Sequence, residues 1–487
     1  MLFGILKRRL AGAGSSPPQL ESRQRLLEEA RTLVSQGLNS AAEIRLEALA
    51  ERFPRDAEIR NEFGILKYAQ GDFSGAETAF RGAIEIAPNY ASALANLGLS
   101  LQARGLFEQA AAKFESALHI EPGNLAAGFN LAIACAALGD RRRAVALCNS
   151  MIAVDPDEAS THLILGECLL ALEDYESGWR EYEWRLRVPG YASYFRSYLE
   201  PLWDGSEHPG GRLLFWAEQG YGDTIQFLRL ARLVIERMPS MLVILDVPTP
   251  LAKLARVSFA DCPNLTVVES GQPLPAFSCH RSIMSLAHLL QQTLNNNPVR
   301  GPYLRAEPQA AAQWARRVTE QAGSRLAVGL VWAGNSLEQL DAPARTSDVR
   351  RSIGAELLAG LLTVPECVFF NLQVGARSGE MATLGCALAD FTPELGDFAD
   401  TAALVAGLDL VITVDTAVVH LAGALGKPVW MLSRFDCCWR WGERRTDVPW
   451  YPTLRAFYQP APGVWEPVLG EVRRALVALL EQRAKSA

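Results

Sequence analysis

The sequence predicts an α-solenoid followed by an α/β region with two parallel, doubly wound sheets. Two observations support this fold class. In the first third, residues of the same type recur every 34 positions, and in the last half, short apolar runs end on polar turns that contain glycine. A chain of 487 residues is too long for one hydrophobic core. We therefore expect a tail, a repeat array and two α/β domains, at 1–22, 23–192, 193–310 and 311–487.

Three residue types keep the 34-residue spacing, which predicts helix–turn–helix repeats. They are Pro54, Pro88, Pro122 and Pro156; Gly37, Gly71, Gly105 and Gly139; and Ala42, Ala76, Ala110 and Ala144. Glycine suits the turn between two helices, and proline marks where the second helix ends. Small residues such as Gly64 and Gly98 let the first helix of a unit pack closely on the second helix. Phe80 and Phe114 fill the core on the side of the second helix. This pattern resembles the tetratricopeptide repeat. The five units are 23–56, 57–90, 91–124, 125–158 and 159–192.

The fifth unit departs from the repeat pattern. It has Glu173 where glycine is usual and Arg185 where a small residue is usual, and it carries Trp179, Tyr182 and Trp184. Tryptophan is costly to leave in water. We therefore expect this unit to pack on the following domain, rather than to end the array as a solvent cap.

Apolar runs of strand length alternate with helical segments after residue 211. The runs are 213–217, 242–247, 265–268, 326–332, 367–372, 408–414 and 429–432. Helices are expected at 224–238, 400–407, 416–426 and 466–485. Strand, glycine turn and helix in this order predict parallel sheets.

The most informative turn is Asp415–His420, which follows one of these runs. A parallel strand that leads into a helix N-terminus creates an anion site, because backbone N–H groups and the helix dipole both point toward it. Open α/β sheets also bind ligands at the carboxyl ends of their strands. We expect the backbone of 416–418 and the Thr416 hydroxyl to contact a phosphate. The structural alternatives are that Asp415 is only an N-cap and that His420 only packs.

Longer strings in both α/β halves resemble bacterial transferases related to the heptosyltransferases of glycosyltransferase family 9. They are Trp216–Thr224, Val331–Asn335, Arg351–Ile353 and Asp415–Pro428, and Trp439–Trp441 and Pro449–Pro452 resemble the version fused to tetratricopeptide repeats. The resemblance covers nearly the whole chain after residue 22. It implies the GT-B architecture, in which two Rossmann-like domains face a cleft. It also implies a nucleotide-sugar co-substrate, no other cofactor, and inversion of the anomeric centre.

Asp223 is the candidate catalytic residue of the first half. A dinucleotide fingerprint is excluded there, because Ile225 replaces its third glycine. The resemblance makes Asp223 the general base and places Gln219, Gly220 and Gly222 on the acceptor side. Sugar transfer to a hydroxyl needs a group that takes the hydroxyl proton. The structural alternative is that Asp223 caps the helix that follows.

The resemblance also implies a donor site in the second half. Its expected members are Trp332, Gly334, Asn335, Arg351, Gln373, Asp415, Thr416, Ala417 and His420. Trp332, Asn335 and Gln373 follow neighbouring strands, so we expect them to face one cleft. Arg351 matches a residue that neutralises the leaving phosphate, although Arg345 and Arg350 compete for that role.

Trp439, Arg440 and Trp441 are expected to lie over the cleft. Aromatic faces suit a sugar or a base, and an arginine suits an anion. The alternative is a packed loop that shields the sheet edge. His280 either lines the acceptor side or belongs to the core, and we favour the core. No metal-ligand triad or DxD pair is evident near the cleft. We therefore expect metal-independent transfer, with protein groups stabilising the leaving nucleotide.

Composition narrows the function. A net charge of −7 argues against a general nucleic-acid binder, which would present a basic face. Nine scattered cysteines indicate a reducing compartment, and no apolar run is long enough to predict a membrane span. We expect a cytoplasmic glycosyltransferase that modifies Ser or Thr of a protein bound by the repeats; in the resembling repeat-fused enzymes that protein can be flagellin. The alternatives are an inactive scaffold and a transferase with a saccharide acceptor.

Overall fold

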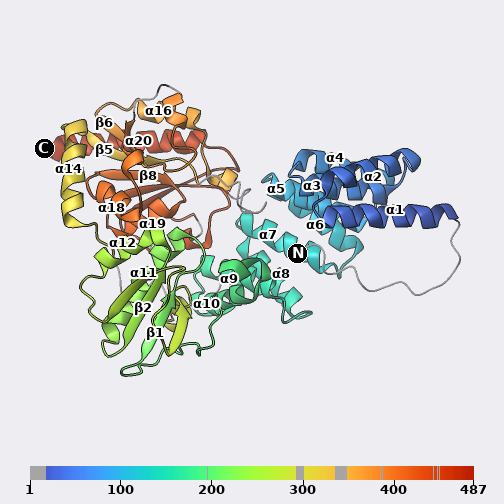
Figure 1. Cartoon of the computed structure of the whole chain (residues 1–487). Helices are drawn as coiled ribbons and strands as arrows, with labels where there is room; N and C mark the ends of the chain where they lie inside the picture. The colour runs from blue at the N-terminus through green and yellow to red at the C-terminus, as the bar shows by residue number, and fades with distance from the viewer. Residues whose placement is uncertain are drawn as a thin grey trace. The chain divides into compact units, whose positions relative to one another are not determined.

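The computed structural model describes residues 18–194, 196–291, 301–334, 348–383, 385, 388–442, 444–446, 448 and 450–486. The chain divides into two compact units, the first ending at Leu138 and the second beginning at Gly139. Figure 1 shows the helices and strands of both units. The second unit takes in the last helices of the predicted repeat array together with both parallel sheets.

The first unit is a series of antiparallel helix pairs. Its helices are α1 (Pro18–Ser35), α2 (Asn39–Arg52), α3 (Ala57–Ala69), α4 (Phe73–Ile86), α5 (Ala91–Ala103), α6 (Phe107–Ile120) and α7 (Leu125–Ala137). The turn glycines Gly37, Gly71 and Gly105 have φ values of 74°, 80° and 76°, which only glycine adopts without strain. A Cβ on Gly98 would lie 2.6 Å from the Phe114 ring, so the predicted close packing of paired helices is confirmed.

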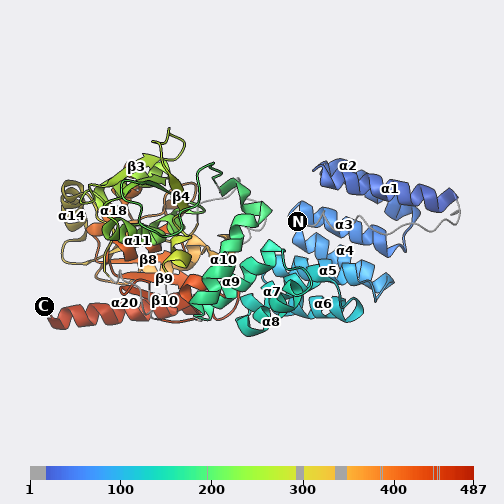
Figure 2. The ribbon, with the colours of Figure 1, turned by 90° about the horizontal axis from the view of Figure 1, so that it is seen from below.

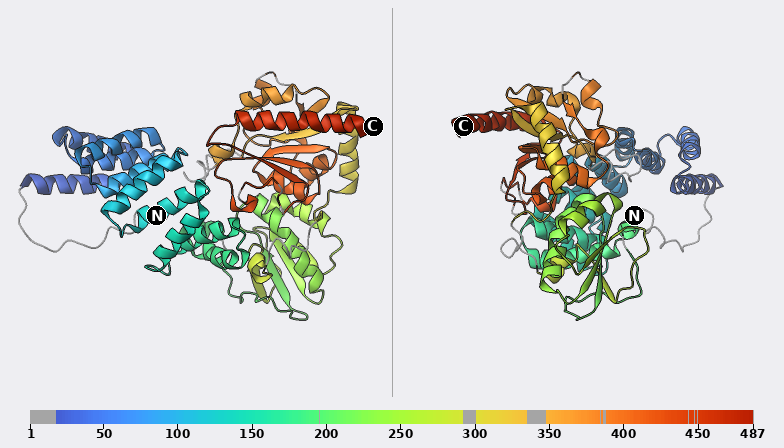
Figure 3. Two further views of the ribbon diagram at one scale, coloured as in Figure 1. Left: turned by 180° about the vertical axis from the view of Figure 1, so that it is seen from behind. Right: turned by 60° about the vertical axis from the view of Figure 1, so that its left-hand side comes forward.

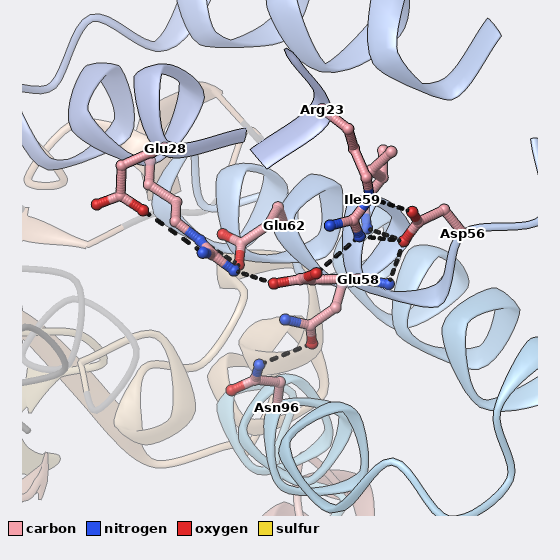
Figure 4. Close-up of polar contacts among 9 residues, drawn as sticks. Arg23, Glu28, Asp56, Glu58, Ile59, Glu62 and Asn96 are labelled. Carbon is pink, nitrogen blue, oxygen red and sulfur yellow. Dashed lines mark hydrogen bonds and ion pairs between the residues drawn. The ribbon is translucent and has the colours of Figure 1, made fainter. Parts of the chain in front are cut away.

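Charged side chains join α1 to α3 within this unit (Figure 4). Arg23 Nε lies 2.6 Å from Asp56 Oδ2, and Arg23 Nη2 lies 2.7 Å from Glu58 Oε2. Arg31 Nη2 lies 2.7 Å from Glu62 Oε1. Asp56 also caps α3, since its Oδ1 accepts from two backbone N–H groups of the first turn. These contacts fix the first helix on the second repeat.

The second unit begins with helices that belong to the repeat pattern. They are α8 (Arg141–Ile152), α9 (Ala159–Ala171), α10 (Tyr175–Tyr182) and the 3₁₀ helices η1 (Glu183–Arg187) and η2 (Pro189–Tyr194). The expected packing of the fifth unit on the α/β region is confirmed (Figure 2). Trp179 is 2% exposed, and its ring lies 6.1 Å from that of Phe227 and 5.3 Å from that of Trp439. Glu173 takes the turn position of the repeat glycines, with φ of 66°.

The first sheet has four parallel strands in the order β3-β2-β1-β4. The strands are β1 (Arg212–Trp216), β2 (Leu242–Val247), β3 (Leu265–Glu269) and β4 (Cys279–Ser282), and the helices are α11 (Tyr221–Arg237), α12 (Thr249–Ser258) and α13 (Leu286–Leu289). Three of these strands were predicted. β4 was missed because its four residues, Cys-His-Arg-Ser, contain no apolar run.

The second sheet has six parallel strands in the order β10-β9-β8-β5-β6-β7. The strands are β5 (Leu326–Val331), β6 (Cys367–Asn371), β7 (Ala389–Asp390), β8 (Leu410–Val414), β9 (Val429–Ser433) and β10 (Leu454–Tyr458). The predictions located four of them and missed β7 and β10. Leu330 of β5 pairs with Ile412 of β8 and with Asn371 of β6, so β5 is central.

Helices cover both faces of the six-stranded sheet (Figure 3). They are α14 (Pro308–Ala322), α16 (Ala359–Leu362), α17 (Glu380–Thr383), α18 (Phe398–Ala406), α19 (Ala417–Ala424) and α20 (Glu466–Ser486), with η3 (Ala355–Leu358), η4 (Thr392–Glu394) and η5 (Trp439–Trp441) between them. The buried hydrophobic residues form separate cores. Val472 of α20 packs with Leu330 in one of them, whereas Val318 of α14 and Val405 of α18 belong to a second one. In the part of the chain that is described, no helix is long and apolar enough to cross a membrane.

Candidate functional site

Strand order indicates where a six-stranded sheet of this kind would bind a ligand. The chain runs outward from β5 to β6 and β7, then returns to the other side of β5 for β8, β9 and β10. The order therefore reverses between β5 and β8, and open α/β sheets bind ligands at the carboxyl ends of the strands beside such a reversal. The turns that leave these ends are Trp332–Gly334 after β5 and Asp415–Thr416 after β8. Both turns were predicted from the sequence to form the donor site.

The turn after β8 delivers the chain into the N-terminus of α19. Thr416 is the N-cap, and its hydroxyl accepts from the Val418 N–H at 3.3 Å. Ala417 is the first residue of the helix. Asp415 does not cap α19; instead its Oδ2 accepts from Trp441 Nε1 at 2.8 Å, which ties η5 to this turn. The two turn residues and Ala417 remain partly exposed. As expected from the sequence, β8 leads through this turn into a helix N-terminus.

Arg351 connects the turn after β5 with the turn after β8. Its Nη1 donates to the Asp415 carbonyl at 3.1 Å, and its Nη2 lies 2.5 Å from Asp348 Oδ1. Gly334 makes room for this pair, because a Cβ at that position would overlap the Asp348 carboxylate. Arg350 instead pairs with Asp436, at 2.9 Å. Arg351 thus joins Asp348 to the β8 turn.

Two expected donor-binding side chains do not face an open cleft. Trp332 is fully buried in the core, and its Nε1 donates to Glu380 Oε2 at 2.9 Å. Gln373 is 2% exposed, and its Oε1 accepts from the backbone N–H of Ala333 at 3.0 Å. The expectation for their orientation is wrong, because both side chains support the β5 turn from beneath it. The third residue, Asn335, and the competing Arg345 lie outside the described residues.

The first turn of α11 forms the facing wall of the site. Gly220 is the N-cap, and its N–H donates to Asp223 Oδ2 at 3.0 Å, so the capping role of Asp223 is confirmed. Gln219 has φ of 60°, a strained backbone for a residue other than glycine. Its Nε2 is buried and has no hydrogen-bond partner among the described residues. Backbone strain and unsatisfied hydrogen-bond donors are common features of ligand-binding sites.

Arg440 ties η5 to the N-terminal part of α11. It lies on η5 and is 8% exposed. Its Nη2 lies 2.5 Å from Asp223 Oδ1, and its Nε donates to Gln226 Oε1 at 2.7 Å. Its guanidinium lies 4.2 Å from the centre of the Trp439 ring. Trp439 and Trp441 are themselves buried, so η5 is a packed loop whose polar groups reach the site.

Gly222 and His420 bring the two helix N-termini together. A Cβ on Gly222 would lie 2.8 Å from His420 Cδ2 and 3.4 Å from Ala417 Cα. His420 Nδ1 lies 2.9 Å from Tyr451 Oη, a contact that the sequence did not predict. Burial, with the charges of Arg440 and Arg229, lowers the pKa of His420 well below its usual range. The imidazole is therefore neutral and packs between the helices, as the structural alternative proposed.

The crevice of the four-stranded sheet is already occupied by the chain itself. Its strand order reverses between β1 and β4. Arg185 of η1, fully buried, enters there: its Nη2 lies 2.6 Å from Glu218 Oε1 and 2.9 Å from Ser285 Oγ. His280 of β4 is buried and accepts from Trp216 Nε1 at 3.2 Å, so the core interpretation of His280 is confirmed.

One carboxylate near the site was missed in the sequence. Glu167 lies on α9, which packs on η5, and it interacts with the charges of Arg440 and Arg434. Burial raises the pKa of Glu167 to about 7. Among the described residues, no group of three or more His, Cys, Asp or Glu side chains could hold a metal ion.

Comparison with protein families gives three matches. Tetratricopeptide-repeat models match residues 27–91 and 101–162. The model of glycosyltransferase family 9 (heptosyltransferase) matches residues 383–432, a segment that contains β7, β8, α19 and nearly all of β9. The family match therefore includes the Asp415–His420 turn.

Comparison with curated and solved proteins extends these matches. The chain is 31% identical over 330 residues to Protein FlbA of Caulobacter vibrioides, covering 63% of this chain and 53% of that protein. It thus spans about half the length of this relative. Among solved structures, PilF of Pseudomonas aeruginosa is 16% identical with a TM-score of 0.33, and the match covers 35% of this chain and 78% of PilF. The tetratricopeptide-repeat protein TTC0263 of Thermus thermophilus is 20% identical with a TM-score of 0.31, and the match covers 34% of this chain and 92% of TTC0263.

Proposed function

Because the chain joins tetratricopeptide repeats to a region related to glycosyltransferase family 9, we propose that it transfers a sugar from a nucleotide-sugar donor to a hydroxyl of an acceptor. The observation that carries the proposal is the position of the family match. It covers the β8–α19 turn, and that turn lies where the strand order of the six-stranded sheet reverses.

The proposed architecture is GT-B. Both sheets are parallel, and each reverses its strand order beside its first strand, as Rossmann-like domains do. The N-terminus of α11 from the first sheet packs on that of α19 from the second, at Gly222 and His420. Such an arrangement supplies an acceptor wall and a donor wall around one site.

In this proposal the donor phosphates lie at the N-terminus of α19. The N–H groups of the first helical turn and the hydroxyl of Thr416 would bind the phosphate oxygens. Arg351, whose side chain is 33% exposed, is placed by Asp348 to neutralise the charge that develops on the leaving nucleotide. These groups stabilise the leaving phosphate without requiring a metal ion.

The acceptor that we propose is a Ser or Thr hydroxyl of a protein held by the repeats, with flagellin as a candidate. The support is the fusion itself, since helical repeat arrays present extended surfaces for protein segments. The proposed compartment is the cytoplasm. A saccharide acceptor is the second candidate, because the matched family model is described as heptosyltransferase.

An inactive scaffold is the rival that experiment must exclude. The full chain is incubated with a panel of nucleotide sugars, with and without protein from the host cell, and free nucleotide is measured. We expect release from one donor, increased by the acceptor protein. The variant R351A should lose most of this release, whereas R483A, which removes an arginine of an exposed ion pair, serves as the matched control. No donor binding and no release would leave only the scaffold.

A further inference from the structure

Arg229 of α11 carries a positive charge into the core of the second unit without a carboxylate to balance it. The residue is 2% exposed. Its Nε donates to the Gln226 carbonyl at 2.9 Å, its Nη1 to the Trp450 carbonyl at 2.8 Å, and its Nη2 to the Tyr303 hydroxyl at 3.2 Å. No acidic side chain among the described residues pairs with it. Burying a cation against neutral partners is costly, so a charge that is kept there calls for an explanation.

Two tyrosine hydroxyl groups lead from Arg229 to His420. Tyr303 Oη lies 3.3 Å from Tyr451 Oη, and Tyr451 Oη lies 2.9 Å from His420 Nδ1. The Tyr451 ring packs directly on the backbone of α19, because a Cβ on Gly423 would lie 2.4 Å from it. The Arg229 guanidinium lies 4.7 Å from the centre of each of the two tyrosine rings. The buried charge is therefore placed next to the hydrogen-bond partner of His420.

The direction of these hydrogen bonds follows from counting hydrogens. A carbonyl oxygen can only accept, so the single hydrogen of the Tyr303 hydroxyl is used on the Ile225 carbonyl, 3.0 Å away. Tyr303 therefore has no hydrogen to donate to Tyr451. The hydrogen of the Tyr451 hydroxyl has two acceptors within reach, and His420 Nδ1 at 2.9 Å is closer than Tyr303 Oη at 3.3 Å. The shorter distance favours donation from Tyr451 to His420 Nδ1.

The charge of Arg229 favours the same direction. Burial, with the charges of Arg440 and Arg229, lowers the pKa of His420, so the imidazole is neutral and carries one hydrogen. If the lone pair is on Nδ1, the negative end of the imidazole dipole faces the Arg229 cation; if the hydrogen is on Nδ1, the positive end faces it. The first arrangement is the more stable one. The hydrogen of His420 is therefore expected on Nε2.

The rest of the imidazole is enclosed, and Nε2 lies where two helix N-termini meet. Trp441 stacks on the ring, with the two ring centres 5.3 Å apart. A Cβ built on Gly222 of α11 would lie 2.8 Å from His420 Cδ2, 3.4 Å from His420 Nε2 and 3.4 Å from Ala417 Cα. Nε2 is thus beside the first turns of both α11 and α19. Among the described residues, His420 makes its hydrogen bond through Nδ1, which leaves Nε2 for a ligand.

We propose that Tyr451 is a positioning residue, oriented by the buried charge of Arg229, that holds His420 as the Nε2–H tautomer for an anionic ligand. The Nε2–H group then donates a hydrogen bond to a phosphate oxygen at the N-terminus of α19. The opposite tautomer would present a lone pair at Nε2, which repels such an oxygen. The tautomer depends on the hydrogen bonds of the chain alone, whereas the assignment of the anion as a donor phosphate rests on the proposed function.

The test is nitrogen NMR of the full chain, isotope-labelled at its histidine nitrogens. Two-bond correlations distinguish a protonated ring nitrogen from an unprotonated one, and the His420 signals are identified by their absence from H420Q. We expect a protonated Nε2 and an unprotonated Nδ1 in the wild type. Y303F should keep this tautomer, because Tyr451 still donates to His420, whereas Y451F should show a mixture of both tautomers. Inorganic pyrophosphate, used as the probe for the donor phosphates, should shift the His420 Nε2 signal of the wild type.

A protonated Nδ1 in the wild type would overturn the proposal, and this result needs no variant to fold. Y451F with the nitrogen signals of the wild type would remove Tyr451 from the positioning role. Pyrophosphate that binds in calorimetry but leaves the His420 signals unchanged would separate the imidazole from the anion. If neither pyrophosphate nor any nucleotide sugar binds while Nε2 is protonated, the proposed function fails and the positioning by Tyr451 stands.

The kinetic test uses the donor that the nucleotide-sugar panel selects. Y451F should lower kcat/KM for this donor by about 10-fold or more, the loss expected when a hydrogen bond to a charged group is weakened. R483A, which breaks an exposed ion pair, should match the wild type. Equal kcat/KM values for Y451F and the wild type would contradict the proposal. Thermal unfolding of each variant shows whether a loss of activity comes from a loss of fold.

Discussion

Gly222 and His420 approach so closely that the glycine cannot be replaced by alanine without a shift. A Cβ at position 222 would lie 2.8 Å from His420 Cδ2, and the imidazole cannot move freely because Tyr451 Oη lies 2.9 Å from its Nδ1. This contact joins α11 of one sheet to α19 of the other. It sets the spacing between the two helix N-termini that line the proposed site.

The first prediction concerns this contact. G222A should lower the free energy of unfolding by about 1–3 kcal/mol, because an added methyl group must push packed neighbours apart. Urea unfolding followed by circular dichroism measures the change. G360A is the matched control, since a Cβ on Gly360 meets nothing within 4 Å. Equal stabilities of G222A and G360A would show that the two helices are not held at this distance.

Arg440 provides the second prediction. R440A leaves Asp223 and Gln226 without their partner, and breaking a largely buried ion pair costs about 3–5 kcal/mol. The partly exposed Asp223 favours the lower end of this range. R483A, which breaks an exposed pair with Asp409, should cost at most about 1 kcal/mol. Chemical denaturation of both variants tests this, and similar losses would contradict a structural role for Arg440.

The repeat array could be predicted because its period is visible in the sequence. Proline, glycine and alanine each kept the 34-residue spacing, and the turn glycines have the positive φ values that their role requires. Strands with continuous apolar runs were located as well. β4 and β7 were missed, because strands of four and two residues are too short to show a periodicity that distinguishes a strand from a loop.

The site was predicted in part. Strand ends are visible in the sequence, so the turns after β5 and β8 were located. The direction of each side chain is not visible, and for this reason Trp332 and Gln373 were expected in a cleft although they are buried. Arg440 was located in the cleft loop, but its partner Asp223 lies 217 residues away along the chain. Glu167 was missed because a single carboxylate within a repeat helix does not show in the sequence that it is buried beside other charges.

The third prediction concerns the helices that precede the sheets. Arg185 is buried between Glu218 and Ser285, and Trp179 packs on Phe227, so these helices belong to the same core as the first sheet. The fragment 139–487 should unfold cooperatively. The fragment 195–487 should bind a hydrophobic dye and lose its cooperative transition, because it exposes the apolar face that the helices cover. Cooperative unfolding of the shorter fragment would contradict this account.

The fourth prediction uses the titration of His420. Its native pKa is lowered, so the unfolded chain binds more protons than the folded chain once the pH falls below about 7. The contribution of His420 to wild-type stability should therefore decrease from pH 7 to pH 5, by up to about 1.4 kcal/mol per pH unit. H420Q keeps a polar group near Tyr451 but does not titrate. Parallel stability curves of the two proteins would show that His420 is not held neutral.

The central claim is that a nucleotide sugar binds where β5 and β8 end and α19 begins. Hydrogen exchange of the full chain, followed by mass spectrometry with and without the nucleoside diphosphate of the active donor, tests it most directly. The account predicts slower exchange in peptides that contain Gly334 and 416–418, and no such protection at these positions in R351A. Binding of the nucleotide with protection confined to other segments, or with none, would contradict it.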